Sequence, residues 1–141
     1  MQSTERMTFA QAIRRDKQLR TSGVGRYRVA PKNERTAPDG TVFHSKMEMH
    51  RYLYLLDRKE RGEIRELKLQ PEFKLQPEFW HEREGDIGSV HYRADFCYYE
   101  RDDGFETLVV EDVKGHRTEV YKIKRKLLLY HYSHIHFREV T

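Results

Sequence analysis

The chain has 141 residues, 37% hydrophobic and 35% charged, which suits one domain with a modest core and an ionic surface. Its one cysteine, Cys97, rules out an internal disulfide and fits a reducing compartment. No apolar run approaches the roughly 20 residues that a membrane helix needs, and the N-terminus lacks the apolar segment of a signal peptide. We therefore expect a soluble, cytoplasmic protein with no membrane partner.

Positive charge is concentrated at the N-terminal end. Residues 1–40 hold nine Lys or Arg and four Asp or Glu, whereas residues 41–141 hold 18 and 19. We expect a basic arm over 1–40, with a short helix that carries Arg14 and Arg15, and then a near-neutral domain over 41–141. Such an arm suggests a polyanionic partner, of which nucleic acid is the commonest, although a solvated tail has the same composition.

The domain begins with a strong helix signal at 45–61. Ser45 and Glu48 fit a capping box, and an apolar stripe follows at helical spacing. Residues 64–69 alternate apolar and charged side chains, as a strand does. A near-repeat at 69–79 (L-Q-P-E-F-K, then L-Q-P-E-F) contains prolines that suit edge strands or turns.

The second half continues with strands predicted at 92–99 and 108–114, a helix at 118–132 and a last strand at 135–140. The order is therefore helix, three strands, helix, strand (α-β-β-β-α-β). This mixture predicts an α/β domain with a central mixed sheet flanked by helices.

The strand at 108–114 ends in charge, because it reads L-V-V-E-D-V-K. Side chains alternate along a strand, so Asp112 and Lys114 share one face and Glu111 points to the other. With the right register, Asp95 on the preceding strand converges with Asp112. Two convergent carboxylates suit a hard cation such as Mg²⁺, and a nearby lysine places positive charge where a phosphate would sit. A structural ion pair is the plainer interpretation of the same residues.

Five stretches, in this order along the chain, resemble the PD-(D/E)xK nuclease superfamily. The match is closer still to a family of small, mostly phage-encoded proteins that was first catalogued as a domain of unknown function. The stretches are F-H-S-K-M-E at 43–48, L-K-L-Q-P-E-F at 67–73, Y-R-A-D-F at 92–96, V-V-E-D-V-K-G at 109–115 and T-E-V-Y-K-I-K-R-K-L at 118–127. The resemblance implies a restriction-endonuclease-like core and a Mg²⁺-dependent DNA endonuclease, with Mn²⁺ as a substitute ion.

The resemblance also implies roles for matching positions. Asp95 and Asp112 would ligate the metal, with the Val113 carbonyl as a further ligand, and Lys114 would orient the attacking water. Alanine, where the motif has proline, precedes Asp95, a departure that is common in this diverse superfamily.

Three further groups each have a plainer interpretation. Glu48 takes the place of a helix glutamate that helps to bind metal, yet it is also the third position of a capping box. Gln70 corresponds to a glutamine near the site in some members, but it could simply hydrogen-bond a turn. The helix at 118–132 carries a basic group that would grip DNA phosphates or form a solvated face: Lys122, Lys124, Arg125 and Lys126.

The expected substrate is DNA, either branched or duplex. A small phage enzyme without a base-reading module suggests a resolvase of branched DNA or Holliday junctions, acting in recombination in the host cytoplasm. Such enzymes act as homodimers, because two strands must be cut. Two other classes also fit: a catalytically inactive DNA-binding module, and a protein-interaction subunit of a phage replication or recombination complex. The intact set of Asp95, Asp112 and Lys114 favours the enzyme.

Overall fold

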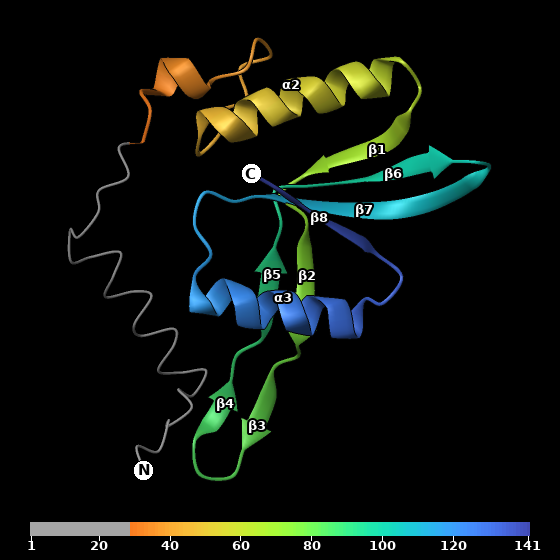
Figure 1. The fold of residues 1–141 in the computed structure, drawn as a ribbon. Coiled ribbons are helices and arrows are strands. Elements are labelled where there is room, and N and C mark those ends of the chain that lie inside the picture. Colours follow the sequence, from red (N-terminus) through yellow and green to blue (C-terminus); the bar gives the residue numbers. More distant parts are fainter. Residues whose placement is uncertain (1–28) are drawn as a thin grey trace, which may run out of the picture.

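The computed structural model describes residues 29–141, so the predicted helix with Arg14 and Arg15 lies outside the described residues. Two α-helices and eight strands follow a short 3-10 helix (Figure 1). The elements are η1 (Lys32–Arg35), α2 (Lys46–Glu60), β1 (Ile64–Leu69), β2 (Glu72–Gln76), β3 (Phe79–His81), β4 (Gly85–Ile87), β5 (Val90–Arg93), β6 (Phe96–Asp102), β7 (Phe105–Val113), α3 (Glu119–His131) and β8 (His136–Val140). Within 29–141, no helix is long and apolar enough to cross a membrane.

Both helices begin where their capping residues predict. The Ser45 hydroxyl accepts a hydrogen bond from the backbone N–H of Glu48 at 3.1 Å, and α2 starts at the next residue. The Thr118 hydroxyl accepts one from the N–H of Tyr121 at 3.1 Å and starts α3. These side chains satisfy amide groups that have no partner inside the helix, and each cap stabilises its helix by about 1 kcal/mol.

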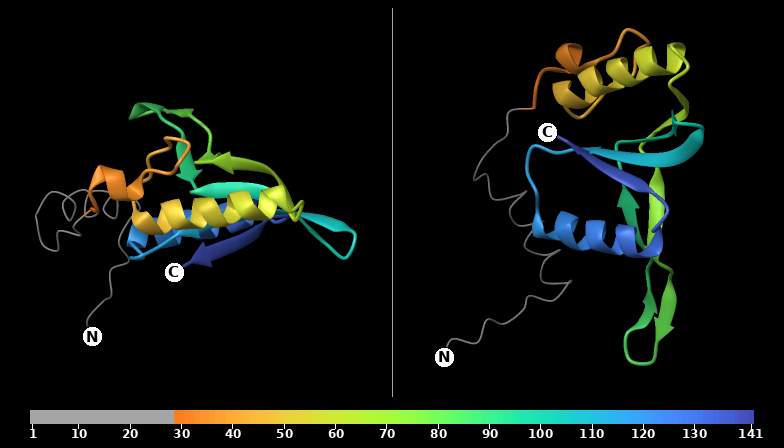
Figure 2. Two further views of the ribbon diagram at one scale, coloured as in Figure 1. Left: turned by 90° about the horizontal axis from the view of Figure 1, so that it is seen from above. Right: turned by 45° about the vertical axis from the view of Figure 1, so that its right-hand side comes forward.

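The central sheet has four strands in the order β1-β6-β7-β8. β6 runs antiparallel to both β1 and β7, and β8 is parallel to β7 because α3 carries the chain back between them. Helix α2 covers one face of this sheet and α3 covers the other (Figures 1 and 2). The predicted α/β class, with a mixed sheet between two helices, is therefore confirmed.

The prediction of one strand over 92–99 was wrong. The strand is interrupted at Ala94 and Asp95. Before this interruption β5 pairs with β2 in a separate two-stranded sheet, and after it β6 enters the central sheet. The predicted order of elements also omitted the hairpin of β3 and β4, which projects away from the body (Figure 1). Apolar residues continue on both sides of the break, so the sequence pattern gives no sign of it.

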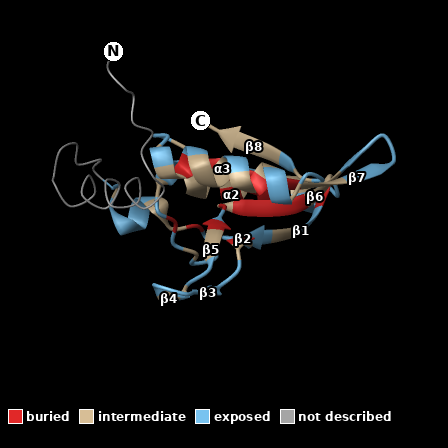
Figure 3. Ribbon diagram, turned by 90° about the horizontal axis from the view of Figure 1, so that it is seen from below, coloured by how far each residue is buried: buried red, intermediate tan, exposed pale blue. Residues whose placement is uncertain are grey.

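The two faces of β7 contact different cores. Val109 and Val113 pack with Tyr52, Leu55 and other residues on the α2 side. Val110 packs with a second cluster on the α3 side, which includes Tyr92, Tyr121 and Leu128. Buried residues therefore run through the middle of the central sheet and onto the helices that cover it (Figure 3). The strict alternation along β7 decides which helix each of its charged residues faces.

Packing of the body extends into the segment predicted as arm. Ala37 is only 3% exposed and belongs to the core on the α2 side. The Tyr52 hydroxyl of α2 also donates a hydrogen bond to Asp39 Oδ2 at 2.7 Å. Residues from Ala37 onward thus contribute to the folded domain, although the expected boundary was at residue 41.

Candidate active site

Asp95 lies at the break between β5 and β6, where three backbone contacts fix it. Its N–H donates to the Glu111 carbonyl at 3.0 Å, and its own carbonyl accepts the N–H of Gln70 at 2.8 Å. Its carboxylate accepts the backbone N–H of Val113, with 2.7 Å between Asp95 Oδ2 and the nitrogen. The interruption between β5 and β6, which the sequence does not reveal, therefore directs this carboxylate toward the end of β7.

Asp112 faces the α3 side of the sheet and is 1% exposed. Its Oδ1 lies 2.9 Å from Lys114 Nζ, and its Oδ2 accepts a hydrogen bond from the Tyr92 hydroxyl. Burial, together with the charge of Asp112, raises the pKa of Tyr92 far above its ordinary value, so the hydroxyl remains a donor. The predicted pairing of Asp112 with Lys114 on one face is confirmed.

The carboxylates of Asp95 and Asp112 converge, as expected if the two segments had the right register, although Asp95 lies between strands and not within one. Burial, reinforced by the negative charges of Asp112 and Glu48, raises the pKa of Asp95 from 3.8 to about 7. The hydrogen bond from Val113 N–H opposes this rise without cancelling it. Crowded carboxylates with a raised pKa are typical of functional sites, because a cation that binds there relieves their repulsion.

Glu48 and Gln70 lie on the α2 side of this pair. Together with Asp95 they line a pocket of about 210 Å³. The Glu48 side chain is 12% exposed, and its Oε2 accepts the N–H of His44 at 3.2 Å, so the residue both caps the helix and lines the pocket. Gln70 has φ +48°, a conformation that costs energy for a residue with a side chain and is enriched at functional sites.

A larger groove lies on the α3 side, and we call it the active-site groove. Its volume is about 630 Å³. Asp112 and Lys114 line it, and most of the other polar side chains around it are basic or aromatic: His91, Tyr92, Arg93, His116, Tyr121 and Lys124. Arg93, Lys114 and Lys124 against Glu72 and Asp112 leave the groove a net charge of +1, with Glu72 paired to Arg93. A small excess of positive charge thus lies near the Asp112 carboxylate, on the side from which a phosphate could approach.

Two tyrosines hold the Asp112–Lys114 pair, and sequence reasoning missed their role. Tyr92 donates to Asp112, and the Lys114 ammonium lies 4.8 Å from the centre of the Tyr121 ring. The Tyr121 hydroxyl in turn donates to Glu139 Oε2 at 2.5 Å. Tyr92 belongs to the core on the α3 side, but the sequence contains no signal that its hydroxyl meets an aspartate 20 residues away.

Glu111 occupies the opposite face of β7 and is fully buried. Arg51 of α2 donates two hydrogen bonds to it, at 2.6 and 2.7 Å, and Tyr98 donates a third. Arg138 lies 3.4 Å away in β8. Glu111 therefore belongs to a structural ion network rather than to the pair of carboxylates, as its place on the strand predicted.

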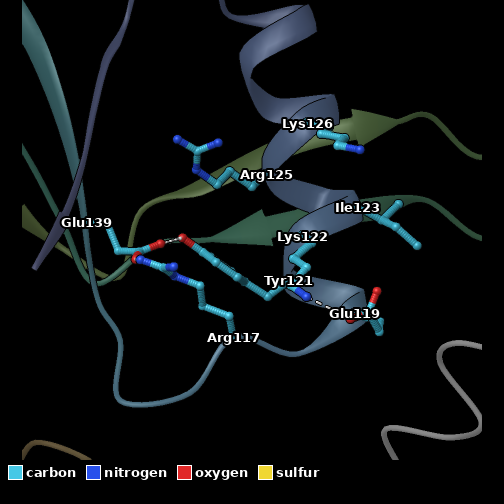
Figure 4. A pocket seen from close by; sticks show the side chains of 8 residues that line it. All are labelled: Arg117, Glu119, Tyr121, Lys122, Ile123, Arg125, Lys126 and Glu139. Carbon is cyan, nitrogen blue, oxygen red and sulfur yellow. Dashed lines mark hydrogen bonds and ion pairs between the residues drawn. The ribbon is translucent and has the colours of Figure 1, made fainter. Parts of the chain in front are cut away.

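The basic residues of α3 divide between two surfaces. Lys124 lines the active-site groove. Three others, Lys122, Arg125 and Lys126, line a separate hollow of about 560 Å³, which we call the α3 hollow (Figure 4). The remaining residues around the α3 hollow are Arg117, Glu119, Tyr121, Ile123 and Glu139.

The chemistry of the donors fits a magnesium ion. Asp95, Asp112 and Glu48 offer the carboxylate oxygens that Mg²⁺ prefers, and Mg²⁺ usually retains several waters, so two carboxylates suffice. Within residues 29–141, no three His, Cys, Asp or Glu side chains are grouped as a ready-made metal site. Asp112 is instead paired with Lys114 and Tyr92. The predicted role of the Val113 carbonyl stays a prediction.

Residues 28–141 match the family model described as "Protein of unknown function (DUF1064)", and the chain belongs to this family. No curated protein and no solved structure matches the chain. The family description names no activity, so the function has to be argued from the site.

Proposed function

We propose that the protein is a Mg²⁺-dependent DNA endonuclease with a restriction-endonuclease-like core, similar to the PD-(D/E)xK nucleases. One observation carries this proposal: Asp95 and Asp112 converge where β7 ends, with Lys114 Nζ 2.9 Å from Asp112. An aspartate between two strands and a D-x-K sequence that begins 17 residues later thus supply two carboxylates and one amine to a single place.

Each side chain has a separate task in this proposal. Asp95 and Asp112, with Glu48, would hold the ion. When bound, Mg²⁺ supplies positive charge that polarises a phosphate ester and lowers the pKa of a water. Lys114 is half-buried beside the groove and would stabilise negative charge on the phosphate.

The supporting residues keep this arrangement in place. Tyr92 holds Asp112 through a hydrogen bond, and the N–H of Val113 holds Asp95. Side chains fixed in this way need little reorganisation during a reaction, which is where much of the catalytic power of enzymes originates. The pocket on one side and the groove on the other would give access to the carboxylate pair from both faces of the sheet.

DNA is the proposed substrate because the groove has a net charge of +1 and the N-terminal arm carries a net charge of +5. We favour branched DNA, such as a Holliday junction, and a homodimer as the acting form. Linear duplex is the alternative substrate.

The test is cleavage of a labelled four-way junction beside a linear duplex of matching sequence. Each is incubated with the wild-type protein and with Lys114→Ala, in Mg²⁺, in Mn²⁺ and in EDTA. We expect cutting in Mg²⁺ that EDTA abolishes and that Lys114→Ala slows by about 10²–10³-fold, with the junction preferred. Equal cutting of both DNAs would support the nuclease activity and contradict the preference for junctions. No cutting in either metal would overturn the proposal and favour a DNA-binding module.

A further inference from the structure

The α3 hollow has an excess of positive charge. Four cationic side chains line it, whereas only Glu119 and Glu139 are acidic, which leaves a net charge of +2. Both carboxylates already have cationic partners: Arg117 Nε lies 2.6 Å from Glu139 Oε1, and Lys122 Nζ lies 2.8 Å from Glu119 Oε1. The net positive charge of the hollow therefore faces solvent, where it can attract an anion.

The shape and surroundings of the hollow suit an extended anion. Arg117, Lys122 and Lys126 are exposed, and Arg125 is half-buried with its guanidinium 5.0 Å from the centre of the Phe137 ring. The cations come from α3 and from the segment that precedes it, so they flank the hollow on more than one side (Figure 4). A polymer with a charge on every unit can contact several of them at once.

Tyr121 separates the α3 hollow from the active-site groove, since it lines both. Its ring lies against the Lys114 ammonium, and its hydroxyl donates to Glu139 in the hollow. A DNA strand in the groove and a strand in the hollow would therefore lie on either side of one tyrosine. The two backbones of a linear duplex keep a fixed separation along the helix, whereas at a branch they diverge and can reach both surfaces.

We infer that the α3 hollow binds the backbone of a second DNA strand, one that is not cut. The inference rests on the proposed nuclease function and names the substrate feature that the site selects, two backbones that diverge at a branch. Lys122 and Lys126 contact phosphates of the uncut strand. Contacts to phosphate carry no sequence information, so this site selects the shape of the DNA and not its sequence.

The experiment measures binding in EDTA, so that nothing is cut. A fluorescein-labelled four-way junction and a linear duplex of the same sequence are titrated with the wild-type protein, and anisotropy is followed at several salt concentrations. The variant is Lys122→Gln with Lys126→Gln. The control, Lys59→Gln with Arg101→Gln, removes the same charge at exposed positions of α2 and β6.

For the variant we expect about tenfold weaker binding of the junction, and a salt dependence reduced by about two ions. The Kd of the variant for the duplex should stay within about twofold of wild type. The Kd of the control variant for the junction and for the duplex should also stay within about twofold of wild type. Equal losses on both DNAs, no loss on either, or a wild-type protein that binds the junction no more tightly than the duplex would overturn the inference. Failure of the nuclease proposal is seen separately, as a wild-type protein that binds DNA and cuts none in Mg²⁺ or Mn²⁺.

Discussion

Glu111 and Asp112 are adjacent in β7, yet their carboxylates lie on opposite faces of the central sheet and have unlike partners. Glu111 accepts two hydrogen bonds from Arg51 on the α2 side. Asp112 contacts Tyr92 and Lys114 on the α3 side. One acidic residue thus anchors the helix that carries Glu48, and the next one faces the groove. The expected effects of substituting them differ accordingly.

Glu111→Gln should destabilise the fold. The substitution removes the buried counter-charge of Arg51, whereas Arg138 still has Glu100 at 3.0 Å. The loss of one partner of a buried ion pair costs about 3–5 kcal/mol. Urea unfolding followed by circular dichroism measures the change in the free energy of unfolding. Glu106→Gln, which removes a carboxylate paired with Arg65 at the surface, is the control and should shift the midpoint little. Equal shifts for both variants would contradict the structural role of Glu111.

Asp95 should make the stability of the metal-free protein depend on pH. Its pKa in the folded state is raised from 3.8 to about 7, so between these values the folded chain holds a proton that the unfolded chain has released. Its contribution to stability is full below about pH 4 and is lost as the pH rises through 7. Asp95→Asn removes this loss because asparagine does not ionise, and its amide oxygen can still accept the Val113 N–H.

The measurement is unfolding in EDTA at several pH values. The stability of Asp95→Asn relative to wild type should grow from pH 5 to pH 8, by at most about 1.4 kcal/mol per pH unit, and level off above. A difference that does not change with pH would show that Asp95 is not crowded in the folded protein.

Divalent ions should stabilise the wild-type protein. Mg²⁺ or Mn²⁺ that binds the folded chain but not the unfolded chain raises the Tm. At a metal concentration a hundred times the Kd, the free energy of unfolding rises by about 2.7 kcal/mol. The rise should be larger at pH 8 than at pH 6, because the ion competes with the proton on Asp95. Differential scanning fluorimetry with and without metal measures it. Asp95→Asn and Asp112→Asn should abolish the rise, and an undiminished rise in both would place the ion elsewhere.

Lys114→Ala should slow the cleavage step without weakening DNA binding. The amine would stabilise charge that develops in the transition state, and loss of one such group typically costs about 10²–10³-fold in rate. Single-turnover cleavage measures the rate, and anisotropy in EDTA measures the Kd, which should stay within about threefold. Lys59→Ala, on the exposed face of α2, is the matched control. A loss that appears only in the Kd would make Lys114 a binding residue.

Much of this arrangement could be predicted from local pattern. The capping residues locate both helices, and the alternation along β7 separates Asp112 and Lys114 from Glu111. The helix caps and the strand alternation depend on residues close together in the sequence, so the local sequence pattern predicts them. The partners of Asp112 and Glu111 could not be predicted in this way, because Tyr92 and Arg51 lie 20 and 60 residues away.

The break at Asp95 was also missed, for a physical reason. The apolar alternation continues through residues 92–99, and the change of sheet is fixed by backbone hydrogen bonds to Gln70 and Pro71. Backbone groups make these bonds whatever side chain a residue carries, so the side-chain pattern does not record them. The prolines of the near-repeat predicted edge strands or turns. Pro71 and Pro77 lie in the connections before β2 and before β3, and each of these strands pairs with one strand only.

The most direct test of the central claim is the cleavage rate of Asp112→Asn in saturating Mg²⁺. Asparagine keeps an oxygen for the Tyr92 hydroxyl but loses the negative charge, and Asp86→Asn in the exposed β3–β4 hairpin is the matched control. We predict that Asp112→Asn folds, binds the junction and cuts it at least about 10²-fold more slowly than wild type. Cleavage at the wild-type rate by Asp112→Asn would contradict the account.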